Sequence, residues 1–484
     1  MEHSKVVVIG GGPAGSTAAS LLAREGVEVL LLERDHFPRY HIGESILPAI
    51  HPMLDLLGAS EKVAAQGYRK KTGQYFNWGT ERWDYRFGAL SGQLVTSYQV
   101  ERADFDKLML DHAREQGVDV REGHRVTEVH FDGDRPTSLT YQNTDTGEQG
   151  RVSFDYLIDA SGRTGILVNR YLGGRTMNES FRNVAVWGYW KDAKELPHAP
   201  EGATVVSAVE EGWVWLIPLR DQMSVGIVLH RDRFQRLKEE NGDLEGFYQA
   251  MLDRAGEVPD ILDGATRVDE GLRVDQDYSY TAERYCGPGY FICGDAACFL
   301  DPLLSTGVHL GHFSALLAAA SIVTLERKEL DQQTVENFYN ESYRRTYLRF
   351  LLVVAAVYRQ YDGKETYFWQ AQRLVGDKGK DVTTPSRTFL NVVTGTTDMA
   401  EITAREVSPE AVEHAAETYR RLAEALKDHS KGKEMTEAER EQAKATAQYW
   451  NSYASTFSTR PDRAVEGLYV STENGLAIRR SDAA

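Results

Sequence analysis

A glycine-rich turn, placed between an apolar run and a run of helix formers, most constrains how this chain folds. The β-branched run Val6–Ile9 ends at the sequence GGGPAG, Gly10–Gly15, and it predicts a buried strand followed by a tight turn. Helix formers follow over Ala14–Glu25, and Val27–Leu32 predicts a second buried strand. The beginning of the chain therefore predicts a β–turn–α–β unit.

The glycines of this turn follow the pattern GxGxxG, with Gly10, Gly12 and Gly15. In this pattern the first glycine permits the tight turn, the second lets a pyrophosphate approach the backbone, and the third lets the helix pack close to the strand. Glu33 stands at the end of the second strand, where a carboxylate can accept ribose hydroxyls and would repel a 2′-phosphate. The turn predicts a dinucleotide site that disfavours NADP, although an ordinary glycine-rich turn has the same pattern.

Later segments predict further strands and helices. Apolar spacing indicates an amphipathic helix over Asp104–Gln116. Between Asn183 and His230, β-rich runs alternate with polar turns, which is typical of an antiparallel sheet. Short apolar runs predict the strands Val118–Val120, Arg125–Phe131, Tyr156–Ala160, Thr204–Val209, Trp213–Pro218, Ser224–His230 and Tyr290–Cys293. Helices are expected over Gln333–Gln360, Glu365–Leu374, Pro409–His429 and Thr436–Ser455.

Composition narrows the class of protein. The chain has 484 residues, with 55 basic and 72 acidic side chains and a net charge of −17, which argues against a nucleic-acid or anionic-membrane surface. The longest apolar runs, Leu316–Ala320 and Phe350–Tyr358, are too short to span a membrane. The cysteines Cys286, Cys293 and Cys298 fit neither a zinc site nor a redox pair. We expect no metal, no export and a cytoplasmic location.

Three further segments indicate which dinucleotide is bound. Asp159–Gly162 (DASG) and Gly294–Ala296 (GDA) resemble the "DG" and "GD" segments of flavin monooxygenases, and Val100–Leu110 with Arg102 resembles a third. In this order, over roughly the first 330 residues, they resemble the FAD aromatic monooxygenase superfamily. The resemblance implies an α/β fold with a Rossmann-like FAD-binding domain, an antiparallel β-sheet substrate domain and a helical C-terminal region.

This resemblance also divides the chain into domains. We assign residues 1–182 to the FAD-binding domain, with an inserted substrate-domain segment at about 56–100. Residues 183–275 form the antiparallel sheet domain, and residues 276–330 return to the FAD-binding domain. Residues 331–484 form the helical C-terminal region.

Four motifs go beyond a generic flavoprotein. Gly43-Glu44-Ser45 lies in Phe37–Pro48, and Lys71 lies in KKTGQYFNWG, Lys70–Gly79. Trp213–Pro218 reads WxWxIP, and Asp301–Gly311 reads DPLLSTGVHLG. Alone, a tryptophan pair of this kind is often only core packing. Together, the motifs resemble those of the flavin-dependent halogenases.

The halogenase resemblance implies roles for particular residues. Lys71 is the expected catalytic residue, and Thr306 with Gly307 is the expected halide site at a helix N-terminus. Trp213, Trp215 and Pro218 are expected to form a wall that keeps an organic substrate away from the flavin. The FAD-binding positions implied are Gly10, Gly12, Pro13, Ala14, Gly15, Glu33, Arg39, Gly43, Ser45, Arg102, Asp295 and Gly307.

The resemblance implies a chemistry as well. A separate flavin reductase supplies FADH2, and O2 with chloride or bromide yields hypohalous acid, which travels to Lys71. There it either hydrogen-bonds to the ammonium or forms a haloamine. The haloamine route needs a neutral amine, so burial would have to lower a lysine pKa of about 10.4. A flavin aromatic hydroxylase is the main alternative, followed by a flavin-dependent ring or double-bond reductase and a non-catalytic flavin-binding or scaffold protein.

One departure bears on the substrate. Tryptophan halogenases carry a glutamate just before the matching serine, where this chain has Leu304. Free indoles are therefore disfavoured, and the pattern resembles halogenases of phenols and pyrroles, some of which act on carrier-protein-tethered groups. Arg344, Arg345 and Arg349 are candidates for contacting an acidic acyl or peptidyl carrier protein. Candidate channel aromatics, for which helix packing is an equal alternative, are Tyr347, Phe350, Tyr358, Tyr367, Phe368 and Trp369.

Overall fold

The computed structural model has the α/β fold expected from the sequence, with mixed sheets and long helices. It describes residues 1–78, 81–87, 95–178, 181–268, 271–276, 279–360, 393–395, 398–399, 402 and 467–480. The helices expected over Glu365–Leu374, Pro409–His429 and Thr436–Ser455 lie outside these residues, as do Tyr367, Phe368 and Trp369. The domain boundaries at residues 182, 275 and 330 stay predictions.

The first sheet carries the glycine-rich turn. Its strands lie in the order β19-β20-β10-β1-β2-β7, and the β8–β9 hairpin joins β10. Because β1 is parallel to β2 and β10, and β10 to β20, their carboxyl ends meet at one edge, where such sheets bind ligands. The strands are β1 (Glu2–Ile9), β2 (Val29–Leu32), β7 (Asp119–Arg121), β8 (His124–Asp132), β9 (Arg135–Asn143), β10 (Gln149–Asp159), β19 (Cys286–Gly287) and β20 (Tyr290–Ile292).

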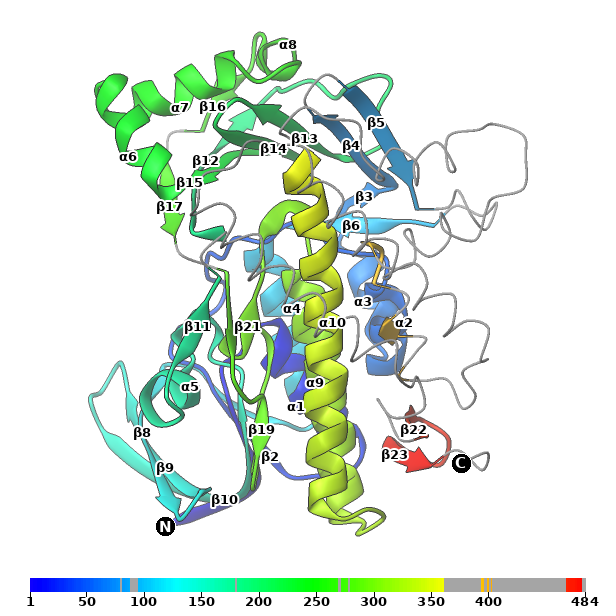
Figure 1. Ribbon diagram of the computed structural model, residues 1–484. Helices are drawn as coiled ribbons and strands as arrows, with labels where there is room; N and C mark the ends of the chain where they lie inside the picture. Colours follow the sequence, from blue (N-terminus) through cyan, green and yellow to red (C-terminus); the bar gives the residue numbers. More distant parts are fainter. Residues whose placement is uncertain are drawn as a thin grey trace, which may run out of the picture.

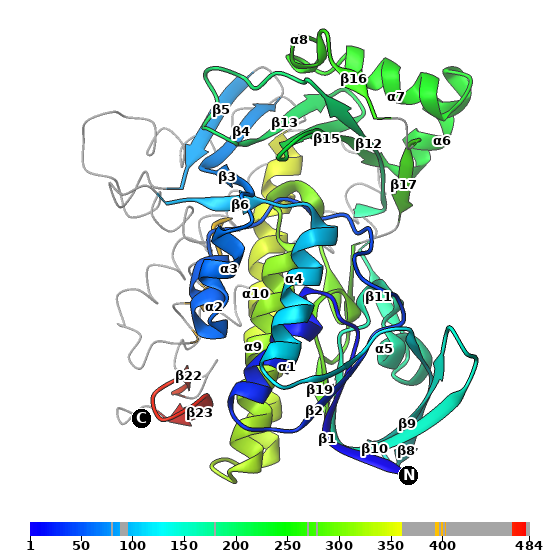
Figure 2. The ribbon, with the colours of Figure 1, turned by 180° about the vertical axis from the view of Figure 1, so that it is seen from behind.

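Long helices pack beside this sheet (Figures 1 and 2). α1 (Pro13–Arg24) packs between α4 (Arg102–Glu115) and α9 (Gly307–Glu326), and α10 (Gln332–Gln360) packs along α9. Of the described helices, α9 alone is long and apolar enough to cross a membrane, but 94% of its apolar window is buried inside the protein. That burial is the property of a core helix, so no membrane span is evident in the described residues.

The second sheet lies across the end of α10 (Figure 1). Its order is β16-β12-β15-β14-β13-β4-β5, with β17 on β12, and β13–β4 is its parallel pair. The strands are β4 (Gly73–Trp78), β5 (Glu81–Arg86), β12 (Asn183–Lys191), β13 (Thr204–Val209), β14 (Gly212–Pro218), β15 (Met223–His230), β16 (Thr266–Arg267) and β17 (Arg273–Gln276). Residues far apart in the chain thus build one sheet.

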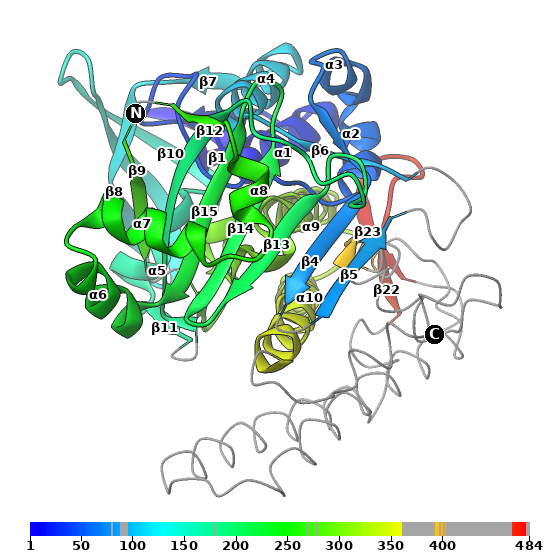
Figure 3. The same ribbon diagram turned by 90° about the horizontal axis from the view of Figure 1, so that it is seen from above.

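The two faces of this sheet have different partners. Trp213 and Trp215 belong to the core shared with the first sheet, whereas Val214 and Leu216 belong to a separate outer core. This alternation is the two-residue period of a strand. The outer core is closed by α6 (Arg231–Glu240), α7 (Leu244–Asp253) and α8 (Val258–Leu262), which cover the sheet in Figure 3. The sequence gives little signal for these helices, because α6 offers few apolar positions for a helical period to show.

Shorter elements complete the described fold. The β22–β23 hairpin docks on α9, where Ile478 N donates to Thr324 Oγ1 over 2.7 Å. Near the second sheet, β3 pairs with β6. The remaining elements are α2 (Ile50–Leu57), α3 (Ser60–Ala64), β3 (Arg69–Lys71), β6 (Ser97–Gln99), α5 (Ile166–Tyr171), β11 (Arg175–Met177), β18 (Tyr280–Ala282), β21 (Cys298–Phe299), β22 (Leu468–Ser471) and β23 (Ala477–Arg480).

Candidate functional site

The glycine-rich turn joins β1 to α1 with no room for side chains. Gly10 has a φ of +102°, and a Cβ there would lie 2.4 Å from the carbonyl oxygen of Ala160. A Cβ on Gly15 would lie 1.9 Å from the Gly10 oxygen. Pro13 opens α1, and Gly12 is its N-cap without a side-chain cap. The first N–H groups of α1 are therefore presented at the carboxyl edge of the sheet.

Two charged side chains flank that helix end. Glu33 follows β2 and accepts hydrogen bonds from Gly11 N at 2.7 Å and Asp35 N at 2.9 Å. A Cβ added to Gly12 would meet only Arg39 Nη2, at 3.4 Å. A space bordered by helix N–H groups, a guanidinium and a carboxylate fits the pyrophosphate and ribose of FAD.

Arg102, the first residue of α4, is buried behind this edge. Its guanidinium forms a bidentate ion pair with Asp106, and Nη1 donates to the carbonyl of Gly43 at 3.2 Å. Gly43 has a φ of +108° and would place a Cβ 2.8 Å from Arg102 Nη1. Arg102 thus binds the backbone of the Gly43–Ser45 segment and fixes the position of that segment.

Asp295 lies in the short 3-10 turn after β20. Burial raises the pKa of its carboxyl to about 6, although Arg102, Arg163 and Arg175 act in the opposite direction. The preceding Gly294 would place a Cβ 3.2 Å from Ala14 Cβ, so this turn lies against the start of α1. A carboxylate at this position fits the hydroxyls of a ribityl chain.

The segment before α9 forms a second helix N-terminus. Asp301 caps a 3-10 turn through Leu303 N at 2.9 Å, and Ser305 then adopts a left-handed conformation with a φ of +60°. Thr306 is the N-cap of α9 and Gly307 its first residue. Thr306 is fully buried, and its Oγ1 has no hydrogen-bond partner among the described residues. An unpaired buried hydroxyl beside free helix N–H groups fits a small anion or a flavin oxygen.

The tryptophan wall is tied to this segment by hydrogen bonds. Trp213 Nε1 donates to Tyr358 Oη at 2.7 Å, and Tyr358 donates to Asp301 Oδ2 at 3.0 Å. The Trp213 and Trp215 rings lie 6.1 Å apart. Burial raises the pKa of the Asp301 carboxyl to about 7 against these hydrogen bonds. Pro218 ends the same strand, β14.

Lys71 ends β3 and is completely buried, with 0% of its surface exposed. Among the described residues its one hydrogen bond runs from Nζ to Ser45 Oγ at 2.8 Å. Burial lowers the pKa of the Lys71 amine to about 7. Three residues along, Gln74 donates to the Leu303 carbonyl at 3.0 Å, which links the lysine strand to the segment before α9.

Several residues singled out from the sequence are buried in the protein interior. Arg349 was a candidate for contacting a carrier protein, and this is wrong, because its buried guanidinium pairs with the buried carboxylate of Asp398. Tyr347 and Phe350 are buried in the hydrophobic core, so the packing alternative holds for both. Leu304 is also buried. The three cysteines are buried and free, as expected.

Sequence reasoning missed Thr204, Asp301 and Asp398 as partners of the site. Asp398 also accepts a hydrogen bond from Nε2 of His309, two residues after Gly307, at 2.9 Å. No spacing rule links residues so far apart in the chain. Asp301 lies beside a proline in the DPLLSTGVHLG motif, but its contact with Tyr358 is apparent only from the fold.

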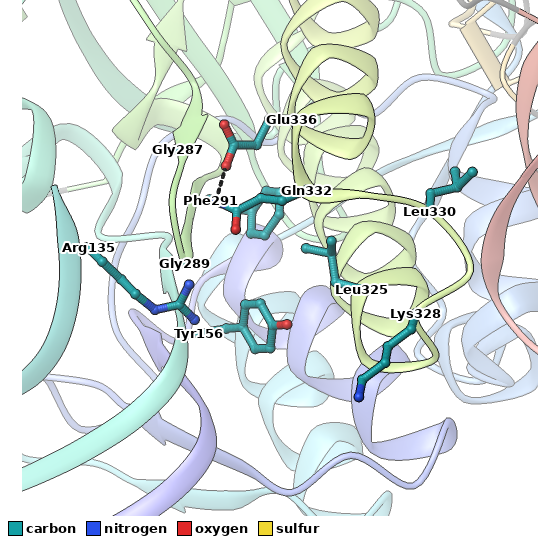
Figure 4. A pocket seen from close by; sticks show the side chains of 10 residues that line it. All are labelled: Arg135, Tyr156, Gly287, Gly289, Phe291, Leu325, Lys328, Leu330, Gln332 and Glu336. Atoms are coloured by element: carbon teal, nitrogen blue, oxygen red, sulfur yellow. Dashed lines mark hydrogen bonds between the residues drawn. The ribbon is translucent and has the colours of Figure 1, made fainter.

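A separate cavity lies far from these groups (Figure 4). It is bordered by the end of α9, which is about 30 Å from the N-terminus of that helix at 1.5 Å per residue. Its lining residues are Arg135, Tyr156, Gly287, Gly289, Phe291, Leu325, Lys328, Leu330, Gln332 and Glu336. None of them belongs to the motifs described above.

Comparison with known proteins agrees with this geometry. Residues 5–96 and 89–419 match the family described as tryptophan halogenase. Over 509 aligned residues the chain is 39% identical to tryptophan 2-halogenase of Chondromyces crocatus, covering 99% of this chain and 94% of that protein. It is 41% identical to flavin-dependent halogenase armH3 of Armillaria mellea, over 75% of each chain. The myxobacterial chondrochloren halogenase CndH, an FAD-dependent halogenase, superposes with a TM-score of 0.71 at 36% identity, covering 82% of this chain and 90% of that one.

Proposed function

The chain belongs to the tryptophan halogenase family of flavin-dependent halogenases, and we propose that it installs chlorine or bromine on an electron-rich ring through Lys71. Enzymes of this family halogenate aromatic substrates with FADH2 and generally need a separate flavin reductase. The observation that carries the proposal is the buried, carboxylate-free Lys71 amine in contact with Ser45. Three free, buried thiols suit a reducing cytoplasm, which we propose as its compartment.

The overall reaction balances in two stages. Reduced flavin, when bound, supplies two electrons, so that FADH2, O2, a halide ion and a proton give FAD, hypohalous acid and water. The aromatic ring then exchanges a C–H bond for a carbon–halogen bond, and the hypohalous acid becomes a second water. The protein contributes binding, orientation and exclusion of bulk water.

The N-terminus of α9 is the proposed halide site. Thr306 Oγ1 and the N–H groups that open α9 at Gly307 offer donors to a small anion. Trp213 and Trp215 belong to the core shared by both sheets, and Pro218 is buried at the end of the same strand. We propose that it separates the flavin from the aromatic substrate, so that only halide-sized species pass.

Lys71 can act in either protonation state. As an ammonium it donates a hydrogen bond to hypohalous acid and polarises the oxygen–halogen bond. As a free amine it exchanges an N–H bond for an N–halogen bond, releasing water, and then passes the halogen to the ring and regains the proton. With its pKa lowered to about 7 by burial, both forms are populated at neutral pH.

We propose a phenol or pyrrole-type ring as the substrate, free or tethered to a carrier protein. Leu304 supplies no carboxylate to assist a less reactive ring. The Chondromyces crocatus relative is named for position 2 of tryptophan, and that carbon belongs to the pyrrole half of indole. Halogenation at a pyrrole-type carbon is therefore consistent both with the missing carboxylate and with the name of this relative. Arg344 and Arg345 stay candidates for contacting an acidic carrier.

One mass-spectrometric assay tests the proposal. The protein with FAD, a flavin reductase, NADH and bromide is offered phenols, pyrroles and tryptophan, free and carrier-bound. We expect a bromine isotope doublet with the parent protein that is lost in Lys71→Ala and kept in Lys70→Ala, the exposed neighbour. Gain of one oxygen without halide would instead make the protein a hydroxylase. Full activity of Lys71→Ala would refute the role of that residue.

A further inference from the structure

Two hydroxyl groups form a hydrogen-bonded chain that begins at the Lys71 amine. Ser45 Oγ lies 2.8 Å from Lys71 Nζ and 2.9 Å from Thr204 Oγ1. All three side chains are buried, with exposed fractions of 0% for Lys71, 6% for Ser45 and 3% for Thr204. Gln99 Nε2 donates to Thr204 Oγ1 and to the Gly202 carbonyl, each at 3.0 Å, and so fixes the far end of the line.

This line joins separate parts of the fold. Lys71 ends β3, Thr204 begins β13, and Ser45 bridges to Gln99 of β6. Four chain segments thus meet around one buried amine. The amine has no exposed surface, so these protein groups supply its hydrogen bonds.

We propose that Thr204 and Ser45 form a reversible hydroxyl pair that positions Lys71 in both of its protonation states. When Lys71 is an ammonium, Nζ donates to Ser45, and Ser45 donates to Thr204. When Lys71 is a free amine, the direction reverses: Thr204 donates to Ser45, and Ser45 donates to the lone pair of Nζ. A hydroxyl can serve as donor or acceptor by rotating, so no heavy atom has to move.

A carboxylate at this place could not do the same. An ionised carboxylate only accepts, so it stabilises the ammonium and raises the lysine pKa. Among the described residues no carboxylate pairs with the amine, and the nearby charged groups have other partners or are exposed. Glu44 accepts from Tyr189 at 2.7 Å, and Arg69 pairs with Glu195 at 2.7 Å. Lys70 is exposed, Arg86 lies 3.3 Å from Asp84, and Glu201 lies 3.9 Å from Arg69.

The inference rests on the proposed function of Lys71 and adds Thr204 as a positioning residue, which touches the amine only through Ser45. It predicts that loss of either hydroxyl destabilises one protonation state of Lys71 more than the other. Without Thr204, the ammonium state leaves the Ser45 proton with no acceptor, whereas the amine state still receives the Ser45 hydrogen bond. The charged state therefore loses more, and the Lys71 pKa falls.

A direct titration of Lys71 tests this without any halogenation. Lysine labelled with 13C beside the amine is followed by NMR in the FAD-loaded protein, and the signal missing from Lys71→Ala assigns Lys71. We expect the pKa to fall by about one unit in Thr204→Val and in Ser45→Ala, because hydrogen bonds to charged groups are about twice as strong as neutral ones. Thr204→Ser, which keeps the hydroxyl, should keep the parent value.

The pH at which the bromination rate falls on the acidic side should shift in the same direction as the Lys71 pKa. An unchanged pKa in Thr204→Val would overturn the proposal, and so would an equal fall in Thr204→Ser, because packing alone would then explain it. If Ser45→Ala loses FAD, the two Thr204 variants decide the matter. If the NMR shifts appear but no halogenated product forms, the hydroxyl pair stands and the proposed halogenase role of Lys71 fails.

Discussion

Replacing Lys71 by methionine should stabilise the protein at neutral pH and change how its stability depends on pH. The side chain is fully buried and has no carboxylate partner in the described part of the chain, so folding must strip the ammonium of water or deprotonate it. Methionine fills a similar volume without a charge. The cost of burying the lysine is therefore removed in Lys71→Met.

The size of the effect follows from the pKa. Burial lowers the Lys71 pKa from 10.5 to about 7. Between these values the unfolded chain binds a proton that the folded protein lacks, so the stability of the parent rises with pH by about 1.36 kcal/mol per unit. The cost is about 4 kcal/mol at pH 7.5 and falls to about 1–2 kcal/mol at pH 9.5. It reaches its full value below pH 7 and disappears above about pH 10.5.

Urea unfolding at pH 7.5 and 9.5 measures this. The stability advantage of Lys71→Met over the parent should shrink by about 2–3 kcal/mol between the two conditions. Taking the difference between variants cancels the other titrating groups. Lys70→Met, at the exposed neighbour, should show no such trend. An advantage that stays constant with pH would mean that Lys71 keeps the same charge folded and unfolded, and would refute the argument.

Three further predictions test other parts of the site. Glu33→Gln should weaken FAD binding at least about tenfold, because a charged acceptor is lost, as measured by flavin fluorescence titration of the apoprotein; unchanged affinity would remove Glu33 from the ribose site. Tyr358→Phe should cost about 1–3 kcal/mol of unfolding free energy in urea, because the buried Trp213 N–H loses its acceptor, whereas a neutral result would mean that water replaces the hydroxyl. Asp301, whose pKa is raised to about 7, ionises as pH rises and should repel halide, so the halide KM should increase about threefold to tenfold from pH 6 to 8 in the parent and stay flat in Asp301→Asn.

Local sequence signals sufficed for the elements that carry their own pattern. The strand Val6–Ile9, the glycine turn and α1 were predictable because strand, turn and helix preferences coincide within a few residues. The WxWxIP strand was predictable in the same way, and its two-residue period even fixed which tryptophans share a face. α6 to α8 were not, because their apolar faces are short and are defined by the sheet they cover.

The sequence indicated candidate site residues one by one but not how they are arranged. Lys71 and Ser45 were each singled out by motif, yet nothing in the sequence indicated that they touch. Thr204 had no signal at all, since a threonine that opens a strand is ordinary. Arg349 was misjudged because a cluster of arginines on a helix favours an exposed interpretation, whereas its partner Asp398 lies 49 positions away.

The charges of the site change together near neutral pH. Burial brings Lys71 and Asp301 to pKa values of about 7, and Asp295 to about 6. Below these values the lysine is charged and the carboxyls are neutral, which favours an anion near α9 but keeps the amine protonated. Above them the amine is free, but Asp301 is anionic beside the proposed halide site. Halide binding and halogen transfer through a free amine thus make opposite demands, and only a narrow range around neutral pH meets both. A neutral hydroxyl pair behind Lys71 keeps that range open, because it favours neither charge state as strongly as a carboxylate would.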